Sequence, residues 1–214
     1  MDAIFRSNAI SIVMAGERNS VQSPVPGHRV VRMTLFWTAL GLFAFSSILQ
    51  TGLIYVQQRS GTLSRWWGGR AFAIYNLITL IPWVAFLLTY VTLQFRQHPL
   101  LPWSSLWLQV IGGILAVLGA FLALWVATLF GPARLNGSRH FTGATEEERI
   151  KSGPFRWIDN PMYTGYFLVL LGIALWQNSL YDLIIALEAL LLLNGVQARI
   201  ENLGLPGRTD SRAN

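Results

Sequence analysis

The sequence predicts an all-α, polytopic integral membrane protein with about five transmembrane helices, the last two forming a helical hairpin. Of its 214 residues, 53% are hydrophobic and only 12% are charged, whereas a typical soluble domain is about 25% charged. The chain also contains charge-free runs long enough to cross a hydrocarbon core about 30 Å thick, which requires roughly 20 apolar residues in a helix. So few charges could not cover the surface of a soluble protein of this length.

Residues 1–33 differ from the rest of the chain. They contain Ser, Asn, Pro, Gly and several charges without helical periodicity. The apolar run 9–15 is too short for the core of a signal peptide, and Asp2 interrupts the basic N-terminal region that such a peptide needs. We therefore expect a flexible or interfacial leader.

Three charge-free runs follow, at residues 34–56, 71–95 and 104–130. Each is long enough for one transmembrane helix. Residues 34–130 are therefore predicted to form three membrane-spanning helices.

A further apolar stretch, residues 162–198, is too long for one span and is interrupted by Trp176-Gln177-Asn178-Ser179, which indicates a turn. We predict a hairpin with arms near 162–176 and 180–198. At about 1.5 Å per residue, the first arm covers only about 22 Å, which is short for a full span. Residues 131–205 are expected to form one core of loop plus hairpin, and residues 206–214 a tail.

Five spans place three segments on one side of the membrane: the loops 57–70 and 131–161 and the residues after the second hairpin arm, 199–214. These segments carry eleven of the sixteen basic residues. They are Arg59, Arg65, Arg70, Arg134, Arg139, Arg149, Lys151, Arg156, Arg199, Arg208 and Arg212. The excess predicts that this face is cytosolic, in an endoplasmic reticulum or bacterial inner membrane. The net charge of +6 is attributed to contacts with anionic lipid headgroups rather than nucleic acid.

The polar block 153–165 is the candidate for chemistry. Asp159 or Asn160 is predicted to be a helix N-cap, with Pro161 as the first helical residue. The simplest interpretation is a helix start alone. The free amides of a helix N-terminus can also bind an anion, and Arg156, one turn earlier, could pair with a carboxylate.

Aromatic and small residues flank this helix start. Tyr163 offers a ring face and a hydroxyl, and Trp157 lies just before the block's polar centre. Gly165 permits close approach of a ligand or of another helix, and Gly172, seven residues on, favours helix packing through small residues.

The block GPFRWIDNPMYTG, followed by an apolar run, resembles the membrane methyltransferases that include phospholipid N-methyltransferases and isoprenylcysteine carboxyl methyltransferases. DNPMY followed by Gly165 is similar to the phosphatidylethanolamine N-methyltransferase branch, whereas GPFRW is closer to the isoprenylcysteine branch. The latter usually has Arg-His where this chain has Asp159-Asn160. The family ends its second hairpin arm with two glutamates, and here Glu201 is followed by Asn202. The resemblance covers residues 131–205.

The resemblance implies S-adenosyl-L-methionine as the methyl donor. The donor's carboxylate is expected at the helix start, its ammonium or ribose at Glu201, and its sulfonium against Tyr163 or Trp157 through a cation–π contact. The cofactor-binding residues implied are Arg156, Asp159, Asn160, Pro161, Tyr163, Gly165 and Glu201. Candidates for the base that accepts the acceptor's proton are Glu201, Asp159 and His140. The expected acceptor is a lipid or lipid-like molecule, with a phosphatidylethanolamine-type amine favoured and Trp157 and Glu188 among its contacts.

Glu188 lies in the middle of the second hairpin arm, where a carboxylate is costly and usually functional. It is interpreted either as part of the substrate cavity or as a protonated or paired group, with Asn194 or Asn76 as partner. Asp182, near the turn, is expected to be solvated. His98 and His140 are isolated and the chain has no cysteine, so no metal site is predicted.

Three alternatives remain open from the sequence. One is carboxyl methylation of a prenylated cysteine or another hydrophobic molecule. The second is an NADPH-dependent membrane reductase, which would be expected to show more basic residues for the 2′-phosphate. The third is a non-catalytic scaffold, which Asn202 in place of a second glutamate favours.

Overall fold

The computed structural model describes residues 26–95, 100–101, 106–135, 137–141 and 153–203. Apart from one isolated bridge between Leu100 and Ser179, all regular elements in these ranges are helices, which confirms the predicted all-α class. The chain divides into two compact units, residues 1–34 and 35–214. The unit boundary lies one residue beyond the predicted end of the leader.

The first described helix, α2 (Pro26–Ser60), begins eight residues before the predicted start of the first span. Proline suits a first helical turn because its missing N–H would have no partner there, so residues 26–33 extend the helix. Residues 1–25 lie outside the described residues, and their role as a leader stays a prediction.

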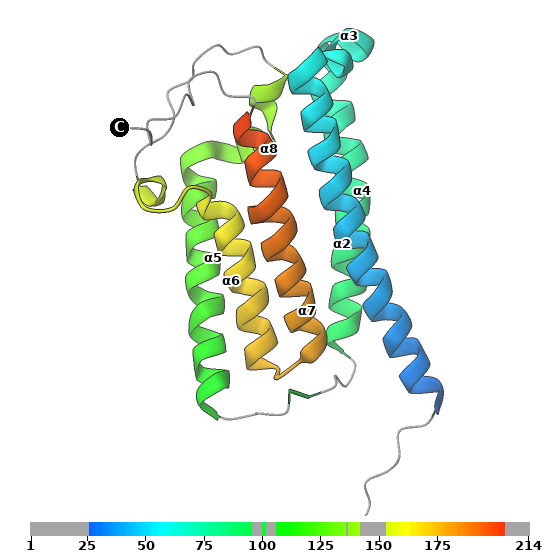
Figure 1. The fold of residues 1–214 in the computed structure, drawn as a ribbon, viewed down its shortest axis with the longest axis vertical. Helices are drawn as coiled ribbons and strands as arrows, with labels where there is room; N and C mark the ends of the chain where they lie inside the picture. Colours follow the sequence, from blue (N-terminus) through cyan, green and yellow to red (C-terminus); the bar gives the residue numbers. More distant parts are fainter. Residues whose placement is uncertain (1–25, 96–99, 102–105, 136, 142–152, 204–214) are drawn as a thin grey trace, which may run out of the picture. The chain divides into compact units, whose positions relative to one another are not determined.

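A short connection joins the first two long helices. Gly61, with a φ of +59°, ends α2 and begins α3 (Thr62–Trp67), which the 3₁₀ turn η1 (Gly68–Arg70) links to α4 (Ala71–Gln94). The positive φ favours glycine because it has no Cβ to clash. The chain reverses direction here, so α4 runs antiparallel to the preceding long helix (Figure 1).

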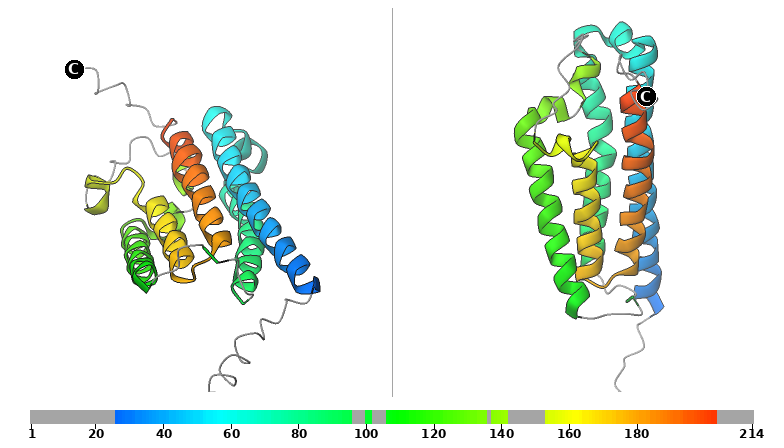
Figure 2. Two further views of the ribbon diagram at one scale, coloured as in Figure 1. Left: turned by 60° about the horizontal axis from the view of Figure 1, so that its bottom comes forward. Right: turned by 60° about the vertical axis from the view of Figure 1, so that its left-hand side comes forward.

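Helices α5 (Leu106–Leu135) and α6 (Pro161–Trp176) lie side by side along their length in every view (Figures 1 and 2). Glycines allow this close contact. A Cβ added at Gly172 would lie 2.4 Å from the backbone nitrogen of Ala116, and one at Gly119 would lie 2.6 Å from the carbonyl oxygen of Gly165. The two backbones therefore approach as closely as small residues permit, as in many membrane helix pairs.

The predicted hairpin is confirmed. After α6, Asn178 adopts a φ of 55° in the turn, and the second arm runs through α7 (Leu180–Ala189), the π-helix η4 (Leu190–Gln197) and α8 (Ala198–Leu203). The Ser179 hydroxyl caps this arm by accepting a hydrogen bond of 3.2 Å from the amide of Asp182. In the π-helical stretch each hydrogen bond spans five residues instead of four, and such stretches often mark a functional segment.

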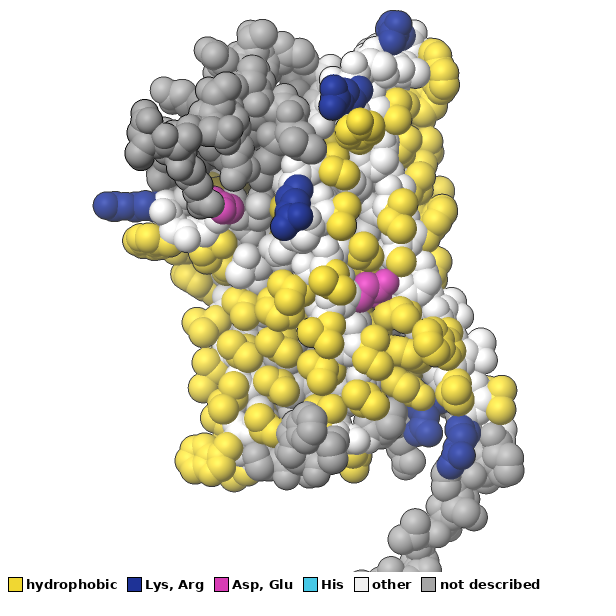
Figure 3. Space-filling model, viewed as in Figure 1, with side chains coloured by type: hydrophobic (Ala, Val, Ile, Leu, Met, Phe, Trp, Pro, Cys, Tyr) yellow, Lys and Arg dark blue, Asp and Glu magenta, His cyan; other side chains and the backbone are white. Residues whose placement is uncertain are grey.

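Four helical stretches are long and apolar enough to cross a membrane, and α6, with 16 residues, is shorter. The four are Arg29–Ser60, Thr62–Gln94, Leu106–Phe130 and Leu180–Ile200. Figure 3 shows hydrophobic side chains across the middle of the face formed by α5, α6 and α7, and within residues 35–203 the Lys and Arg side chains lie toward the α3 and α8 end. The chain is an integral membrane protein whose first hairpin arm is too short for a full span, as the sequence indicated.

The helix directions place α3, the turn at 137–141, the start of α6 and the end of α8 at one end of residues 35–203 (Figures 1 and 2). The α6–α7 turn lies at the opposite end, where the amide of Leu101 donates to the carbonyl of Asn178 at 3.1 Å. The described parts of the three segments predicted to share a face therefore do so. The start of α6, with the end of α8, forms the candidate site.

Candidate functional site

The short 3₁₀ turn η3 (Gly153–Arg156) leads into the candidate site. The carbonyl oxygen of Pro154 accepts hydrogen bonds from the amides of Trp157 at 3.2 Å and Ile158 at 3.0 Å. Pro154 is buried, whereas Trp157 is 74% exposed. The turn is thus anchored by its proline and presents its tryptophan outward at the end of the bundle.

Helix α6 begins at Pro161, as predicted, with Asn160 as its N-cap. The Asn160 carbonyl accepts from the amide of Thr164 at 3.0 Å, but the Asn160 side chain makes no capping hydrogen bond. Arg156 and Asp159 are both exposed just before this turn. A helix start that its own cap side chain leaves uncovered, with an exposed guanidinium nearby, suits an anionic group such as a carboxylate.

Tyr163 connects this helix start with the last arm of the hairpin. Its side chain is only 8% exposed and belongs to the same buried cluster as Leu193 of η4 and Ala198 of α8. The first turn of α6 therefore contributes to the same apolar core as the last arm of the hairpin. Glu201 follows three residues later in α8, but its side chain lies outside the described part of the structure, so its predicted contacts stay predictions.

Gly165 is buried against α5. A Cβ at this position would lie 2.9 Å from the carbonyl oxygen of Gly119 and 3.1 Å from the backbone nitrogen of Ala123. Of the two interpretations open from the sequence, close approach of a helix is the one that this packing supports. A role of Gly165 toward a cofactor stays a prediction.

His140 is held at the end of α2. Its Nδ1 lies 3.1 Å from Nε2 of Gln58, and its carbonyl oxygen accepts from Nε2 of Gln57 at 3.1 Å. The contact with Gln58 engages one of the two ring nitrogens of His140.

Gln57 is a structural residue that the sequence analysis missed. Its side chain is 7% exposed, donates to the Ser64 hydroxyl at 2.6 Å and accepts from the Ser64 amide at 3.1 Å. It therefore ties α2 to α3 and, through the His140 carbonyl, to the turn at 137–141. The only sequence signal for this role was a polar residue at the end of an apolar run. Such a residue does not indicate that its partner, the His140 carbonyl, lies 83 residues away in the chain.

Glu188 lines an open groove of about 390 Å³. The groove lies between α2 and the second hairpin arm, and its lining also includes Leu40, Ala44, Ile184, Leu187, Leu191 and Leu192. Oε2 of Glu188 and Nδ2 of Asn194 are each buried without a hydrogen-bond partner among the described residues. The pairing of Glu188 with Asn194 is therefore not formed, and the position of Glu188 fits the substrate-cavity interpretation.

Asp182 is fully buried, so the expectation that it is solvated is wrong. Its Oδ1 accepts a hydrogen bond of 2.8 Å from Nε2 of Gln94, which lies at the end of α4. The turn does lie at the end of the bundle, but α4 covers it from the side. Asp182 thus stabilises the end of the protein opposite the candidate site.

A comparison with known protein families gives a match, which covers the region just described. Residues 107–204 match the phospholipid methyltransferase family, and this segment includes nearly all of α5 and the whole hairpin. The predicted resemblance to membrane methyltransferases is confirmed over this segment, whereas the roles of the individual site residues stay predictions. No curated protein and no solved structure matches the chain.

Proposed function

We propose that this chain transfers a methyl group from S-adenosyl-L-methionine to a membrane lipid or lipid-like acceptor, with a phosphatidylethanolamine-type amine favoured. The observation that carries the proposal is the match of residues 107–204 to the phospholipid methyltransferase family. The matched segment contains the motif block before α6 and Glu201 in α8. Tyr163 of α6 and Ala198 of α8 belong to the same buried hydrophobic cluster. Donor and acceptor would meet at this end of the bundle.

The residues at the start of α6 suit the donor. Arg156 is exposed and Asn160 leaves the first turn of α6 without a side-chain cap, so together they would hold the donor's carboxylate. Glu201 would hold its ammonium or ribose. The exposed ring of Trp157 would contact the sulfonium cation. When bound, S-adenosylmethionine supplies an electrophilic methyl group.

The protein's part in such a transfer is to position the reactants and to accept one proton. Holding the acceptor nitrogen in line with the methyl group supplies much of the rate. An amine acceptor must lose a proton, and Glu201 and the exposed Asp159 are the stronger candidates to take it. His140 is the weaker candidate because Gln58 engages its Nδ1.

The membrane spans argue for an acceptor that is itself in the membrane. Glu188 and the apolar side chains around it form a groove within the spanning segments α2 and α7, where only an apolar or amphipathic molecule would be at low free energy. The excess of basic residues in the loops at the site end favours a cytosolic active face.

Calorimetric titration of the purified, detergent-solubilised protein with S-adenosylmethionine, and separately with NADPH, tests the proposal. Donor binding without NADPH binding is the expected result, and Glu201→Gln should abolish it. Binding of NADPH alone would assign the chain to the membrane reductases. Binding of neither ligand to folded protein would support a scaffold without catalysis. Isotope-labelled donor with phosphatidylethanolamine or with a prenylated cysteine then separates the two kinds of methyl acceptor.

A further inference from the structure

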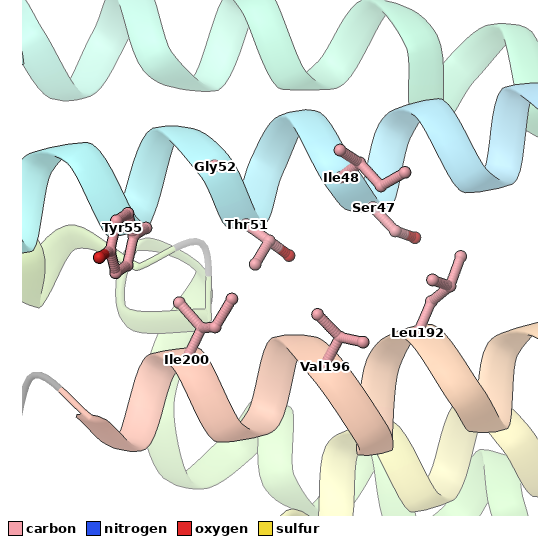
Figure 4. Close-up of a pocket in the computed structure, with 8 residues that line it drawn as sticks. All are labelled: Ser47, Ile48, Thr51, Gly52, Tyr55, Leu192, Val196 and Ile200. Carbon is pink, nitrogen blue, oxygen red and sulfur yellow. The ribbon is translucent and has the colours of Figure 1, made fainter.

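A cluster of buried oxygen atoms lies where α4 ends and α7 begins, at the end of the bundle opposite the candidate site. The two open grooves are lined mostly by apolar side chains, among them the groove of about 280 Å³ between α2 and the second hairpin arm (Figure 4). The α4–α7 end is different. Oδ2 of Asp182 and Oε1 of Gln94 are both buried there without a hydrogen-bond partner among the described residues.

One hydrogen bond keeps these two oxygens close together. Nε2 of Gln94 donates to Oδ1 of Asp182 at 2.8 Å, and the two unpaired oxygens are bonded to the same carbons as this donor and this acceptor. The Tyr90 hydroxyl lies one turn before Gln94, on the same face of α4. Tyr90 is 6% exposed, and its hydroxyl is close enough to the Asp182 carboxylate to interact with it. Oxygens from two helices therefore surround one buried carboxylate.

The local structure of α7 does not use the free oxygen of Asp182. Asp182 is the third residue of α7, and in a capping box the side chain at this position accepts from the N-cap amide. Here the N-cap amide, from Ser179, donates to the carbonyl of Ala174 at 2.9 Å. Asp182 is also 0% exposed, so bulk water does not solvate its carboxylate. A buried acceptor without a partner is costly, and this one calls for a bound group.

The charges at this end favour a cation as that group. Among the described residues, the hydrogen bond to the Asp182 carboxylate comes from the neutral amide of Gln94, and Oδ2 has no partner. The positive end of the α7 dipole interacts favourably with an ionised Asp182. The negative end of the α4 dipole, at Gln94, interacts favourably with a cation. Sodium sites in membrane transporters likewise combine carbonyl oxygens with helix C-terminal ends.

The charge of the ion follows from the single carboxylate. One positive charge balances Asp182, whereas a divalent ion would leave a net positive charge buried in the protein, which is costly. We propose that the end of α4 and the start of α7 bind one monovalent metal ion, coordinated by Oδ2 of Asp182 and Oε1 of Gln94, with the Tyr90 hydroxyl as a third oxygen. The ion fastens α4 to the hairpin. This site is separate from the proposed methyl transfer and does not depend on it.

Sodium is the probe for the test, and thermal unfolding is the measurement. The full-length protein is purified in detergent without sodium and unfolded at fixed pH while sodium chloride replaces choline chloride at constant ionic strength. We expect the unfolding midpoint to rise with sodium and to saturate. At a sodium concentration one hundred times the dissociation constant, the rise should be about 5–10 °C.

Three variants locate the response. Asp182→Asn keeps the size of the side chain but removes its charge, so its unfolding midpoint should not respond to sodium. Tyr90→Phe keeps the ring in the core and removes one oxygen, so it should need a severalfold higher sodium concentration for the same rise. The matched control Glu188→Gln removes the other carboxylate of α7, whose Oε2 is also buried without a partner among the described residues. It should keep the full response.

A wild-type midpoint that does not depend on sodium would overturn the proposal, as would an equal response in Asp182→Asn or a lost response in Glu188→Gln. Two further results would name the group that replaces the ion. Sodium-independent stability that falls as pH rises would show that a proton neutralises Asp182. Sodium-independent stability that is lost in Arg96→Gln would assign the positive charge to Arg96, which lies outside the described residues.

Discussion

The α5–α6 interface and the α2 side of the hairpin are built in opposite ways. At the interface, a Cβ at Gly172 would lie 2.4 Å from a backbone nitrogen of the neighbouring helix, whereas a Cβ at Gly52 of α2 would meet nothing within 4 Å. The same residue type therefore serves close packing in one region and an open groove in the other. The segment that matches the methyltransferase family contains the tight interface, and the open grooves lie where that segment meets α2.

This difference suggests that the two regions have different roles. A closely packed pair of backbones holds the start of α6 in place, as a site for a cofactor requires. A groove lined by flexible apolar side chains can accept a lipid chain from the membrane. The two regions should consequently respond differently to the same substitution, and the following predictions exploit that.

The largest effect is expected from Gly172→Ala, compared with Gly52→Ala. The new methyl group at Gly172 would overlap backbone atoms of Ala116 and Gly112, and overpacking of this kind costs about 1–3 kcal/mol. At Gly52 the methyl group has open space, and replacing a mid-helix glycine gains about 0.5–1 kcal/mol. Unfolding in detergent should show shifts of opposite sign, and equal shifts would contradict the contrast.

Asp182→Ala should lower stability without affecting the site. The change removes the part-buried hydrogen bond of 2.8 Å from the Gln94 amide to Asp182, at a cost of about 1 kcal/mol. Because Asp182 lies at the opposite end of the bundle, the affinity for S-adenosylmethionine should be unchanged. A loss of donor affinity in folded protein would show that the two ends are coupled.

Gln57→Leu should loosen the turn at 137–141. The variant loses the bonds to Ser64 and to the His140 carbonyl, of which each contributes about 1 kcal/mol. Limited proteolysis within residues 137–141 should become severalfold faster. Gln58→Leu, which removes only the bond to Nδ1 of His140, is the control and should show a smaller change.

The smallest change in stability is expected from Glu188→Gln. The substitution keeps the shape of a side chain whose Oε2 has no partner among the described residues, so unfolding should shift by less than about 0.5 kcal/mol. If Glu188 lines the acceptor's groove, the affinity for a lipid acceptor changes. Lower stability with unchanged acceptor affinity would assign Glu188 a structural role instead.

Much of the fold follows from local sequence features. The charge-free runs predicted the first three spans, and Trp176 to Ser179 predicted the turn of the hairpin, because span length and turn chemistry are local properties. The π-helix at Leu190–Gln197 was not predicted. A segment that is apolar on most sides lacks the hydrophobic periodicity that would distinguish a π-helix from an α-helix. The start of α2 at Pro26 was missed because its first turns are polar.

The candidate site was predictable only where its residues are close in sequence. The helix start at Pro161 follows from Asn160 and the proline itself. The burial of Asp182 depends on Gln94, and the engagement of His140 depends on Gln58, each more than 80 residues away.

The most direct test of the account is to measure donor and lipid binding separately in two variants, Glu201→Gln and Gly52→Leu. Titration calorimetry with S-adenosylmethionine, and displacement of a fluorescent phosphatidylethanolamine, are carried out on each purified protein. The account predicts that Glu201→Gln loses donor binding and keeps lipid binding, whereas Gly52→Leu narrows the groove of about 280 Å³ between α2 and the second hairpin arm, keeps donor binding and loses lipid binding. Unchanged donor affinity in Glu201→Gln, or equal loss of both ligands in Gly52→Leu, would contradict it.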